Sequence, residues 1–484
     1  MKLNNPELLR SQCLINGEWC DALSGKREAV INPATGAELA SIPLVSEEET
    51  QQAIAAAQRA QNDWKQLTAK QRSALLLAWA DKVLAAQEDL AQLMTAEQGK
   101  SLAEARGEVA YAASFITWFA EEAKRVDGAV LQAPQASQRL VVVKQPIGVC
   151  AAITPWNFPA AMITRKVAPA LAAGCAIIVK PAEQTPLTAL ALAKLAQDAG
   201  IPAGVLQVVT GEAVQVGKVL CDSPVVRKLS FTGSTEVGRI LMAQCAPSIK
   251  KLSLELGGNA PVIVFDDANL DAAVAGIMAS KFRNSGQTCV CANRIYVQDG
   301  IYERLAEKLV AAVEQLKVGD GSQEGTTQGP LIDSDAVAKV QSHIDDALIK
   351  GAQIATGGQP HALGGTFFQP TVVTGVTQKM RFAKEETFGP VAPLFRFHDE
   401  AEAIAMANDT EFGLAAYLFT QNAARQWRVP EALEYGMVGI NTGLISNEVA
   451  PFGGVKQSGL GREGSRYGIE EYLELKYLCI DVSC

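Results

Sequence analysis

The sequence has 484 residues, enough for two or three domains, with 48% hydrophobic and 20% charged residues. Its formal net charge of −9 and the lack of a dense basic block argue against nucleic acid as a partner. No apolar run approaches the roughly 18 residues of a membrane span, and the start of the chain lacks the apolar core of a secretory signal. We therefore expect a globular cytoplasmic protein that does not enter a membrane.

Ten cysteines are scattered along the chain without a C-x-x-C pair, and only three histidines accompany them. This composition does not predict a metal site. In a reducing compartment most of these cysteines are expected to be small buried side chains. A catalytic role for any of them must be argued from its surroundings.

The first clear secondary-structure pattern runs from about residue 46 to 124. Apolar residues recur there at three- and four-residue spacings, which predicts two or three helices. Residues 133–136 resemble a loop, and the apolar runs 140–143 and 147–149 are typical of strands. This second stretch predicts a protruding hairpin.

After residue 150, short apolar strands alternate with helices, which is typical of parallel βαβ units. Strands are expected at 176–179 and 205–209, with a helix from about 186 to 199 between them. Thr185 suits the N-cap of that helix, and Gly200 suits the left-handed position after its end. A further unit joins 228–231 to 232–238, and another αβ region runs from about 261 to 434.

Two segments have glycine patterns that could hold the phosphates of a dinucleotide. Residues 459–464 match G-x-G-x-x-G, but they follow a glycine-rich stretch rather than a buried strand, so we do not assign them this role. Residues 233–238 follow a strand and are expected to open a helix whose N-terminal amides face a pyrophosphate. A plain strand-to-helix turn is the alternative.

Cys289 lies in the polar, glycine-containing segment 282–291, which is unlike a core strand. We expect an accessible thiol with a lowered pKa, as a nucleophile requires, although a buried structural cysteine is the alternative. No histidine lies in a comparable segment, so the favoured base is a carboxylate. Glu255 is the candidate, because apolar neighbours would raise its pKa; an ion pair or a helix end is its other explanation.

Six segments together resemble the aldehyde dehydrogenase family, and the resemblance covers essentially the whole chain. The segments are 154–159 (TPWNFP), 180–186 (KPAEQTP), 231–234 (FTGS), 255–258 (ELGG), 286–289 (GQTC) and 386–390 (ETFGP). The resemblance implies that Cys289 attacks an aldehyde, while Asn157 and the Cys289 amide stabilise the oxyanion. It further implies that hydride passes to NAD or NADP and that Glu255 activates the water that hydrolyses the thioester.

The same resemblance assigns the cofactor contacts. Lys180 and Glu183 are expected at the adenosine ribose. The remaining cofactor residues are expected at the phosphates and the nicotinamide end: Trp156, Gly233, Ser234, Leu256, Glu386 and Phe388. A carboxylate at Glu183 would repel the 2′-phosphate of NADP, so NAD is expected to be preferred, although Lys180 could offset part of that repulsion.

Within the family, the sequence most resembles succinate-semialdehyde dehydrogenases, through residues 162–166, 280–284, 289–291 and 443–446. The resemblance implies that Arg165, Arg283 and Ser446 hold the distal carboxylate of the substrate. Two guanidiniums suit a small dicarboxylic semialdehyde, because arginine binds carboxylates bidentately. Each arginine alone could instead belong to a structural ion pair, and glutarate semialdehyde remains an alternative substrate.

The implied fold is α/β and aldehyde dehydrogenase-like, with three parts. A Rossmann-like cofactor domain comprises 1–130 and 149–260, a catalytic α/β domain comprises 261–434, and a small β oligomerisation element comprises 131–148 and 435–484. A dimer or tetramer is expected, with the hairpin combining with a C-terminal strand at 472–477. Two other interpretations remain open: a cysteine-dependent acyl-transfer enzyme without redox chemistry, and a non-catalytic binding protein.

Cys291 lies two residues after Cys289, so the two side chains point to the same side if the segment is extended. A reversible disulfide between them is then conceivable. Two residues of strand span about 6.6 Å between Cα atoms, near the upper limit for such a bond. The alternative is that Cys291 is a packed small hydrophobe.

Overall fold

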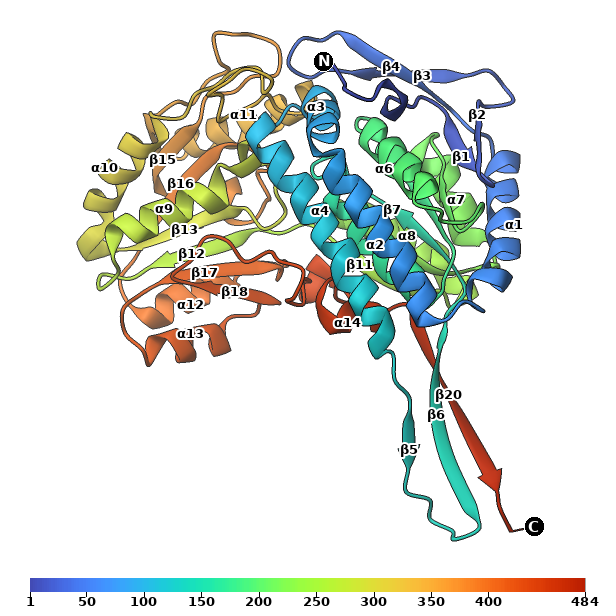
Figure 1. Cartoon of the computed structure of the whole chain (residues 1–484). Helices are drawn as coiled ribbons and strands as arrows, with labels where there is room; N and C mark the ends of the chain where they lie inside the picture. Colours follow the sequence, from blue (N-terminus) through green and yellow to red (C-terminus); the bar gives the residue numbers. More distant parts are fainter. Residues whose placement is uncertain (484) are drawn as a thin grey trace.

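Two mainly parallel sheets form the centres of two lobes, and a small antiparallel sheet forms a projecting arm (Figure 1). The structure is a computed structural model and describes residues 1–483; Cys484, at the end of the predicted segment 435–484, lies outside the described residues. The α/β class predicted from the sequence is confirmed.

Four helices precede the parallel strands: α1 (Glu47–Trp64), α2 (Ala69–Ala85), α3 (Gln87–Gln98) and α4 (Leu102–Glu122). The prediction of two or three helices over 46–124 is therefore too low. Short breaks separate the helices, and Ser46, Thr68 and Ser101 each begin a new one with a capping box. The capping serines and threonine are the signals that mark these boundaries.

The first lobe contains an eight-stranded sheet in the order β19-β11-β10-β7-β8-β9-β1-β2. Five neighbouring strands in it are parallel: β7 (Val149–Ile153), β8 (Ile177–Lys180), β9 (Leu206–Val208), β10 (Val226–Thr232) and β11 (Lys251–Glu255). The antiparallel strands β1 (Cys13–Ile15), β2 (Glu18–Cys20) and β19 (Gly459–Leu460) complete its edges. The connecting helices are α5 (Ala161–Ala173), α6 (Pro186–Asp198), α7 (Ala213–Asp222) and α8 (Thr235–Cys245). The predicted βαβ alternation is confirmed here.

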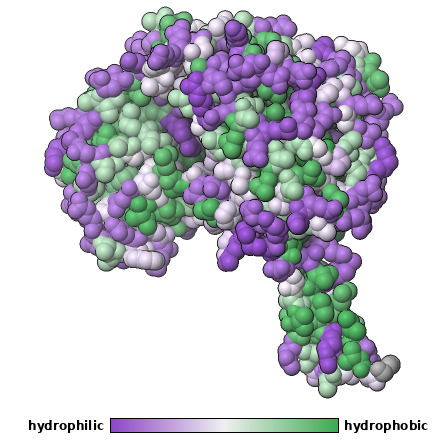
Figure 2. Space-filling model, in the orientation of Figure 1, coloured by the Kyte–Doolittle hydropathy of each residue, from purple (hydrophilic) through white to green (hydrophobic). Residues whose placement is uncertain are grey.

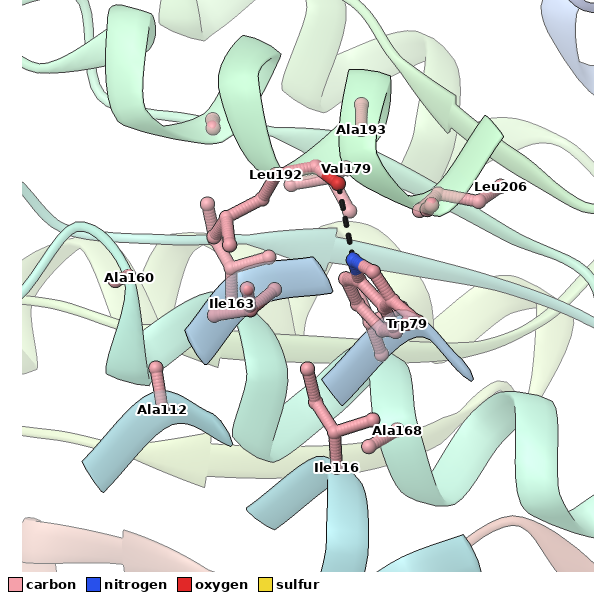
Figure 3. Packing of buried hydrophobic residues seen from close by; sticks show 14 of the residues in the cluster. Trp79, Ala112, Ile116, Ala160, Ile163, Ala168, Val179, Leu192, Ala193 and Leu206 are labelled. Carbon is pink, nitrogen blue, oxygen red and sulfur yellow. Dashed lines mark hydrogen bonds between the residues drawn. The ribbon is translucent and has the colours of Figure 1, made fainter. Parts of the chain in front are cut away.

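Trp79 on α2 shows how the helices are fixed to this sheet (Figure 3). Its fully buried indole Nε1 donates a hydrogen bond to the carbonyl oxygen of Leu192 on α6 at 3.1 Å. Ile116 of α4, Ile163 of α5 and Val179 of β8 belong to the same core cluster. A buried indole N–H needs an acceptor, so this bond fixes α2 against α6 within an apolar core. Helices α4 and α5, which carry site residues, are anchored in the same cluster.

The two glycine-rich segments differ as the sequence indicates. Residues 233–238 open α8 after β10, with Ser234 as N-cap accepting from the Val237 N–H at 3.3 Å. Residues 459–464 instead form the edge strand β19, antiparallel to β11, and a following turn. Only the first has the strand-to-helix context of a phosphate loop.

The second lobe contains a seven-stranded sheet in the order β14-β15-β16-β13-β12-β17-β18. Its strands are β12 (Ala260–Val264), β13 (Ala292–Gln298), β14 (Gln353–Thr356), β15 (Thr371–Val376), β16 (Val391–Phe397), β17 (Ala415–Phe419) and β18 (Met437–Ile440). Its helices are α9 (Leu270–Lys281), α10 (Tyr302–Val313), α11 (Ser334–Ile349), α12 (Glu400–Asn408) and α13 (Arg425–Ala432). Because β18 pairs with β17, this lobe continues past the predicted boundary at 434. Because β19 pairs with β11, part of 435–484 also belongs to the first lobe.

The arm consists of β5 (Ala129–Leu131), β6 (Gln138–Pro146) and β20 (Leu473–Asp481). The predicted combination of the hairpin near 131–148 with a C-terminal strand is confirmed, and that strand extends beyond the expected 472–477. A separate hairpin, β3 (Arg27–Ile31) and β4 (Glu38–Pro43), lies near the N-terminus, and the short helix α14 (Ser465–Glu470) precedes β20. Among residues 1–483, no helix is long and apolar enough to cross a membrane.

Candidate active site

Cys289 lies on a turn between the short 3-10 helix η4 (Arg283–Gly286) and β13. The side chain is partly exposed, as the sequence predicts, and it lines two different cavities. One cavity has a volume of about 290 Å³ and is also lined by Arg165 and Arg283, and the other, of about 270 Å³, is also lined by Glu386 and Phe388. The thiol therefore lies where the two cavities meet.

The backbone that precedes Cys289 has an unusual conformation. Asn284, Ser285 and Gly286 have φ values of 51°, 54° and 74°, which are left-handed. At Gly286 a Cβ would lie 2.1 Å from the carbonyl oxygen of Gly389, so only glycine fits there. The Asn284 N–H donates to Glu104 Oε1 at 2.7 Å. Contacts from α4 thus hold a strained loop in place, as is common next to reactive residues.

Asn157 is joined directly to this loop. Its Nδ2 donates to the Gln287 carbonyl oxygen at 3.0 Å, and its own carbonyl accepts from Lys100 Nζ at 2.8 Å and from Asn284 Nδ2 at 3.0 Å. Asn157 is buried and lines the same cavity as Cys289. The Cys289 N–H donates no hydrogen bond within residues 1–483. These two groups have donors available for an oxyanion, as the sequence implies.

The resting thiol of Cys289 is not activated. Burial raises its pKa to about 12; Arg165 and Arg283 lower it, while Glu386 and Glu255 raise it further. The sequence-based expectation of a lowered pKa is therefore wrong for the free protein, because desolvation outweighs the two arginines. Thiolate formation needs additional positive charge or a base.

Glu255 ends strand β11 and is buried, with neither carboxylate oxygen forming a hydrogen bond among the described residues. Burial and the charge of Glu463 raise its pKa well above the usual value, which confirms the predicted raised pKa. The carboxylate faces Gly453, where a Cβ would lie 2.9 Å from Oε1. Glu255 is not among the residues that line either cavity.

Six predicted cofactor residues come together around the 270 Å³ cavity: Trp156, Gly233, Ser234, Leu256, Glu386 and Phe388. Trp156 and Phe388 contact edge to face, with ring centroids 5.5 Å apart. Burial raises the pKa of Glu386 to about 7, and its Oε1 accepts from the Gly258 N–H at 3.1 Å. At Gly233 a Cβ would lie 2.4 Å from the Phe231 ring. The cavity is thus lined by both aromatic and polar residues.

Lys180 and Glu183 do not line the 270 Å³ cavity. Lys180 is buried, and its Nζ forms an ion pair with Glu183. Glu183 lines a third cavity, of about 540 Å³, which shares Ile332 and Asp333 with the cavity beside Cys289. The two cavities therefore adjoin, and together they have the elongated form that a dinucleotide requires.

Arg165, Arg283 and Ser446 all line the 290 Å³ cavity. Arg165 is buried; its Nε lies 2.9 Å from Glu463 Oε2, and its guanidinium carbon lies 3.9 Å from the Phe452 ring centroid. Arg283 forms no ion pair with any described residue. Arg165 is thus partly engaged in a structural ion pair, whereas the charge of Arg283 is available for a ligand.

The segment that carries Cys291 is not the extended strand on which its predicted role depends. Its N–H donates to the Thr288 carbonyl at 2.9 Å, so residues 288–291 form a turn rather than an extended segment. The alternation expected of a strand therefore does not apply. Cys291 is buried, and Lys281 Nζ donates to its sulfur at 3.2 Å.

Sequence reasoning missed several charged residues around the site. Glu463 is buried and accepts from Lys166, and Lys100 forms a buried ion pair with Glu108 at 2.5 Å. Glu463 lies within segment 459–464, which matches G-x-G-x-x-G but is not assigned to phosphate binding. A single carboxylate among glycines is the feature that could have pointed to it. Among residues 1–483, no group of histidine, cysteine and carboxylate side chains is arranged to hold a metal.

Comparisons with known proteins agree with this geometry. A model described as the aldehyde dehydrogenase family matches residues 19–478. A succinate-semialdehyde dehydrogenase (NADP(+)) of Escherichia coli strain K12 is 65% identical over 99% of this chain and 100% of its own. A glutarate-semialdehyde dehydrogenase of Pseudomonas putida is 64% identical over 100% of both chains. The crystal structure of succinate-semialdehyde dehydrogenase from Burkholderia pseudomallei matches with a TM-score of 0.99 at 64% identity, covering 100% of both chains. The chain therefore belongs to the aldehyde dehydrogenase family.

Proposed function

We propose that the protein oxidises a short dicarboxylic semialdehyde to the dicarboxylate, with NAD or NADP as hydride acceptor. Succinate semialdehyde is the first candidate, and glutarate semialdehyde is the alternative. The observation that carries the proposal is the position of Cys289 between a cavity containing two arginines and a cavity suited to a dinucleotide. The names of the similar bacterial dehydrogenases support the same substrate class.

The residues support a stepwise mechanism. Cys289 Sγ loses its proton to solvent and adds to the aldehyde carbon, and Asn157 Nδ2 and the Cys289 N–H hold the oxygen that becomes negatively charged. A dinucleotide held by Trp156, Ser234 and Glu386 would accept the hydride, and a thioester on Cys289 would remain. Glu255 then takes a proton from the water that attacks this thioester. The product acid leaves, and the thiol is regenerated.

The roles of Arg165, Arg283 and Ser446 follow from the chemistry of the far end of the substrate. A carboxylate accepts hydrogen bonds only, and all three side chains carry donors into the cavity. A charge-assisted hydrogen bond contributes about 1.5–3 kcal/mol. Together these groups favour an aldehyde with a second carboxylate over an uncharged one of the same length.

The substrate assignment is tested by comparing kcat/KM for succinate semialdehyde, glutarate semialdehyde and butanal. We expect the two semialdehydes to exceed butanal by a factor of about 100 or more, given two charge-assisted contacts. The Arg283→Ala variant should lose most of that preference while its turnover of butanal stays nearly unchanged. Equal efficiency of the wild-type protein with all three aldehydes would contradict the assignment.

We also propose that NAD is preferred over NADP. Glu183 and Glu28 line the same cavity, and burial together with the charge of Glu183 raises the pKa of Glu28. Two carboxylates outnumber Lys180 there and would repel a 2′-phosphate. The similar E. coli enzyme is named as NADP-dependent. We therefore expect the two proteins to differ in their preferred dinucleotide.

The cofactor preference is measured as the ratio of kcat/KM for NAD to that for NADP. Glu183→Ser should lower this ratio, because it removes one repulsive charge and frees Lys180 from its ion pair. Gln184→Ala, at a neighbouring position of the same cavity, is the control and should leave the ratio nearly unchanged. A higher kcat/KM of the wild-type protein with NADP would show that this assignment of Glu183 is wrong.

A further inference from the structure

Tyr111 is a polar residue of the 290 Å³ cavity to which neither the sequence nor the mechanism above gives a role. It lies on α4 and lines the cavity with Arg165 and Arg283. Its hydroxyl is buried and forms no hydrogen bond within residues 1–483. An edge-to-face contact with Phe115, with ring centroids 4.9 Å apart, fixes its ring. Burying a hydroxyl without a hydrogen-bond partner costs free energy of folding. This unpaired group is therefore expected to bind a ligand.

Other charged groups of this cavity already have partners. Lys100 donates to Glu108 at 2.5 Å and to the Asn157 carbonyl at 2.8 Å. Glu104 accepts from the Asn284 N–H at 2.7 Å. These residues support the loop that carries the nucleophile. They therefore have little capacity left for a substrate.

Donors are left unpaired on the arginine side of the cavity. Arg165 Nη2 and Arg283 Nε are buried and, like the Tyr111 hydroxyl, form no hydrogen bond among the described residues. Both arginine charges act on Tyr111, since they lower the pKa of its hydroxyl, which burial raises. An unpaired acceptor, Asn284 Oδ1, also belongs to this cavity, but the Nδ2 of the same amide donates to the carbonyls of Asn157 and Gln287.

We propose that the Tyr111 hydroxyl donates a hydrogen bond to the distal carboxylate of the substrate, beside Arg165 and Arg283, and is a specificity-determining residue. This assignment rests on the proposed function. A carboxylate can accept about four hydrogen bonds, which is enough for the three donors and the Ser446 hydroxyl. An uncharged tail would leave the same buried donors unpaired, and sites of this kind reject such analogues strongly.

The test is Tyr111→Phe, which removes one donor and keeps the ring. We expect kcat/KM for succinate semialdehyde to fall about 10- to 100-fold, the range for one hydrogen bond to a charged group. The value for butanal should change by less than about twofold, since butanal has no group for this donor to bind. The inhibition constant of the product succinate should rise by a similar factor to the loss in kcat/KM. Tyr467→Phe, which alters an exposed hydroxyl on α14, is the matched control and should change none of these values.

The outcomes separate this assignment from the proposed function. If wild-type protein does not prefer the semialdehyde over butanal, both are overturned. If that preference exists and survives in Tyr111→Phe, or if both aldehydes lose efficiency equally, only the assignment of Tyr111 is overturned. The melting temperature of Tyr111→Phe should not fall, because the lost hydroxyl is unpaired. Tyr111→Leu serves as a second variant without the donor and should show the same selective loss.

Discussion

Glu255 and Glu463 are two buried carboxyl groups in one charged cluster, and their surroundings shift their pKa values in opposite directions. Burial would raise the pKa of Glu463, but Lys166 and Arg165 hold it below the usual value. Burial and the negative charge of Glu463 raise the pKa of Glu255. Glu463 is therefore the stronger acid of the two and Glu255 the weaker one. The base of the proposed mechanism acts only in its deprotonated form, which the raised pKa disfavours.

Thioester hydrolysis should therefore accelerate with pH. Because the pKa of Glu255 is raised, its basic fraction grows about tenfold per pH unit until that pKa is reached. Glu255→Gln should form the thioester and one burst of reduced nicotinamide, and then turn over slowly at a rate that no longer rises with pH. Stopped-flow absorbance measures both phases. A pH-rate profile unchanged by the substitution would exclude Glu255 as the base.

Cys291 remains a candidate partner for a reversible disulfide with Cys289, which would consume one peroxide and release two waters. The turn at 288–291 brings positions two residues apart closer than a strand does. We expect mild peroxide to inactivate the wild-type protein and dithiothreitol to restore it. Cys291→Ala should keep basal activity and lose the reversible part, leaving over-oxidation of Cys289. Equal thiol-reversible inactivation of Cys291→Ala, with peptide mapping, would rule out this pairing.

The sequence predicts the identity of the site residues better than their electrostatics. Asn157, Arg283 and Glu386, which motif resemblance singles out, line the cavities beside Cys289, because residue types and order suffice to find them. The pKa of Cys289 depends on burial and on charges that include Arg165, Glu255 and Glu386 from three other segments, which no local pattern contains. The partner of Arg165, Glu463, lies almost three hundred residues away in the chain.

At the level of elements, the N-terminus of α6 depends on another helix. The expected N-cap Thr185 makes no capping hydrogen bond, and its hydroxyl contacts the Trp156 carbonyl instead. Glu97 of α3 accepts from the Leu187 and Thr188 N–H groups at 2.7 and 2.8 Å. The local sequence predicts the helix and its proline at the first turn, but it cannot reveal a cap supplied by a distant residue.

Glu97→Ala should destabilise the first lobe, because two buried N–H groups lose their acceptor. The expected loss is about 2–4 kcal/mol, at roughly 1–2 kcal/mol for each group. The midpoint of thermal or urea unfolding measures this change. Glu48→Ala, at an exposed position of α1, is the control and should shift the midpoint little. A Glu97→Ala midpoint equal to that of the control would show that this contact is not stabilising.

At the scale of the whole molecule, the exposed residues of the arm are not covered by any other part of residues 1–483. Figure 2 shows apolar side chains concentrated on this projection. Val130 is 78% exposed and Leu475 is 69% exposed, and Tyr477 and Ile480 are exposed on the same sheet. An exposed apolar sheet of this kind is typical of an interface. We propose that the arms of further copies of this chain cover it in a homo-oligomer.

Leu475→Lys should weaken this assembly, because it places a charge on the apolar surface of β20. Size-exclusion chromatography with light scattering should show smaller species for this variant than for the wild-type protein. Val214→Lys changes an equally exposed apolar residue, 81% accessible, on α7 far from the arm in sequence, and serves as the control. The proposed interface would be contradicted if the wild-type protein is a monomer and Leu475→Lys has the same molecular mass in solution.

The central claim is that Cys289 couples oxidation of a carboxylate-bearing aldehyde to reduction of a dinucleotide. The most direct test records the absorbance of reduced nicotinamide and the succinate formed when succinate semialdehyde and NAD or NADP are mixed with wild-type protein or with Cys289→Ala. We predict equal amounts of reduced nicotinamide and succinate with the wild-type protein, and neither product with Cys289→Ala. Full activity of Cys289→Ala, or wild-type turnover without reduction of the dinucleotide, would contradict the account.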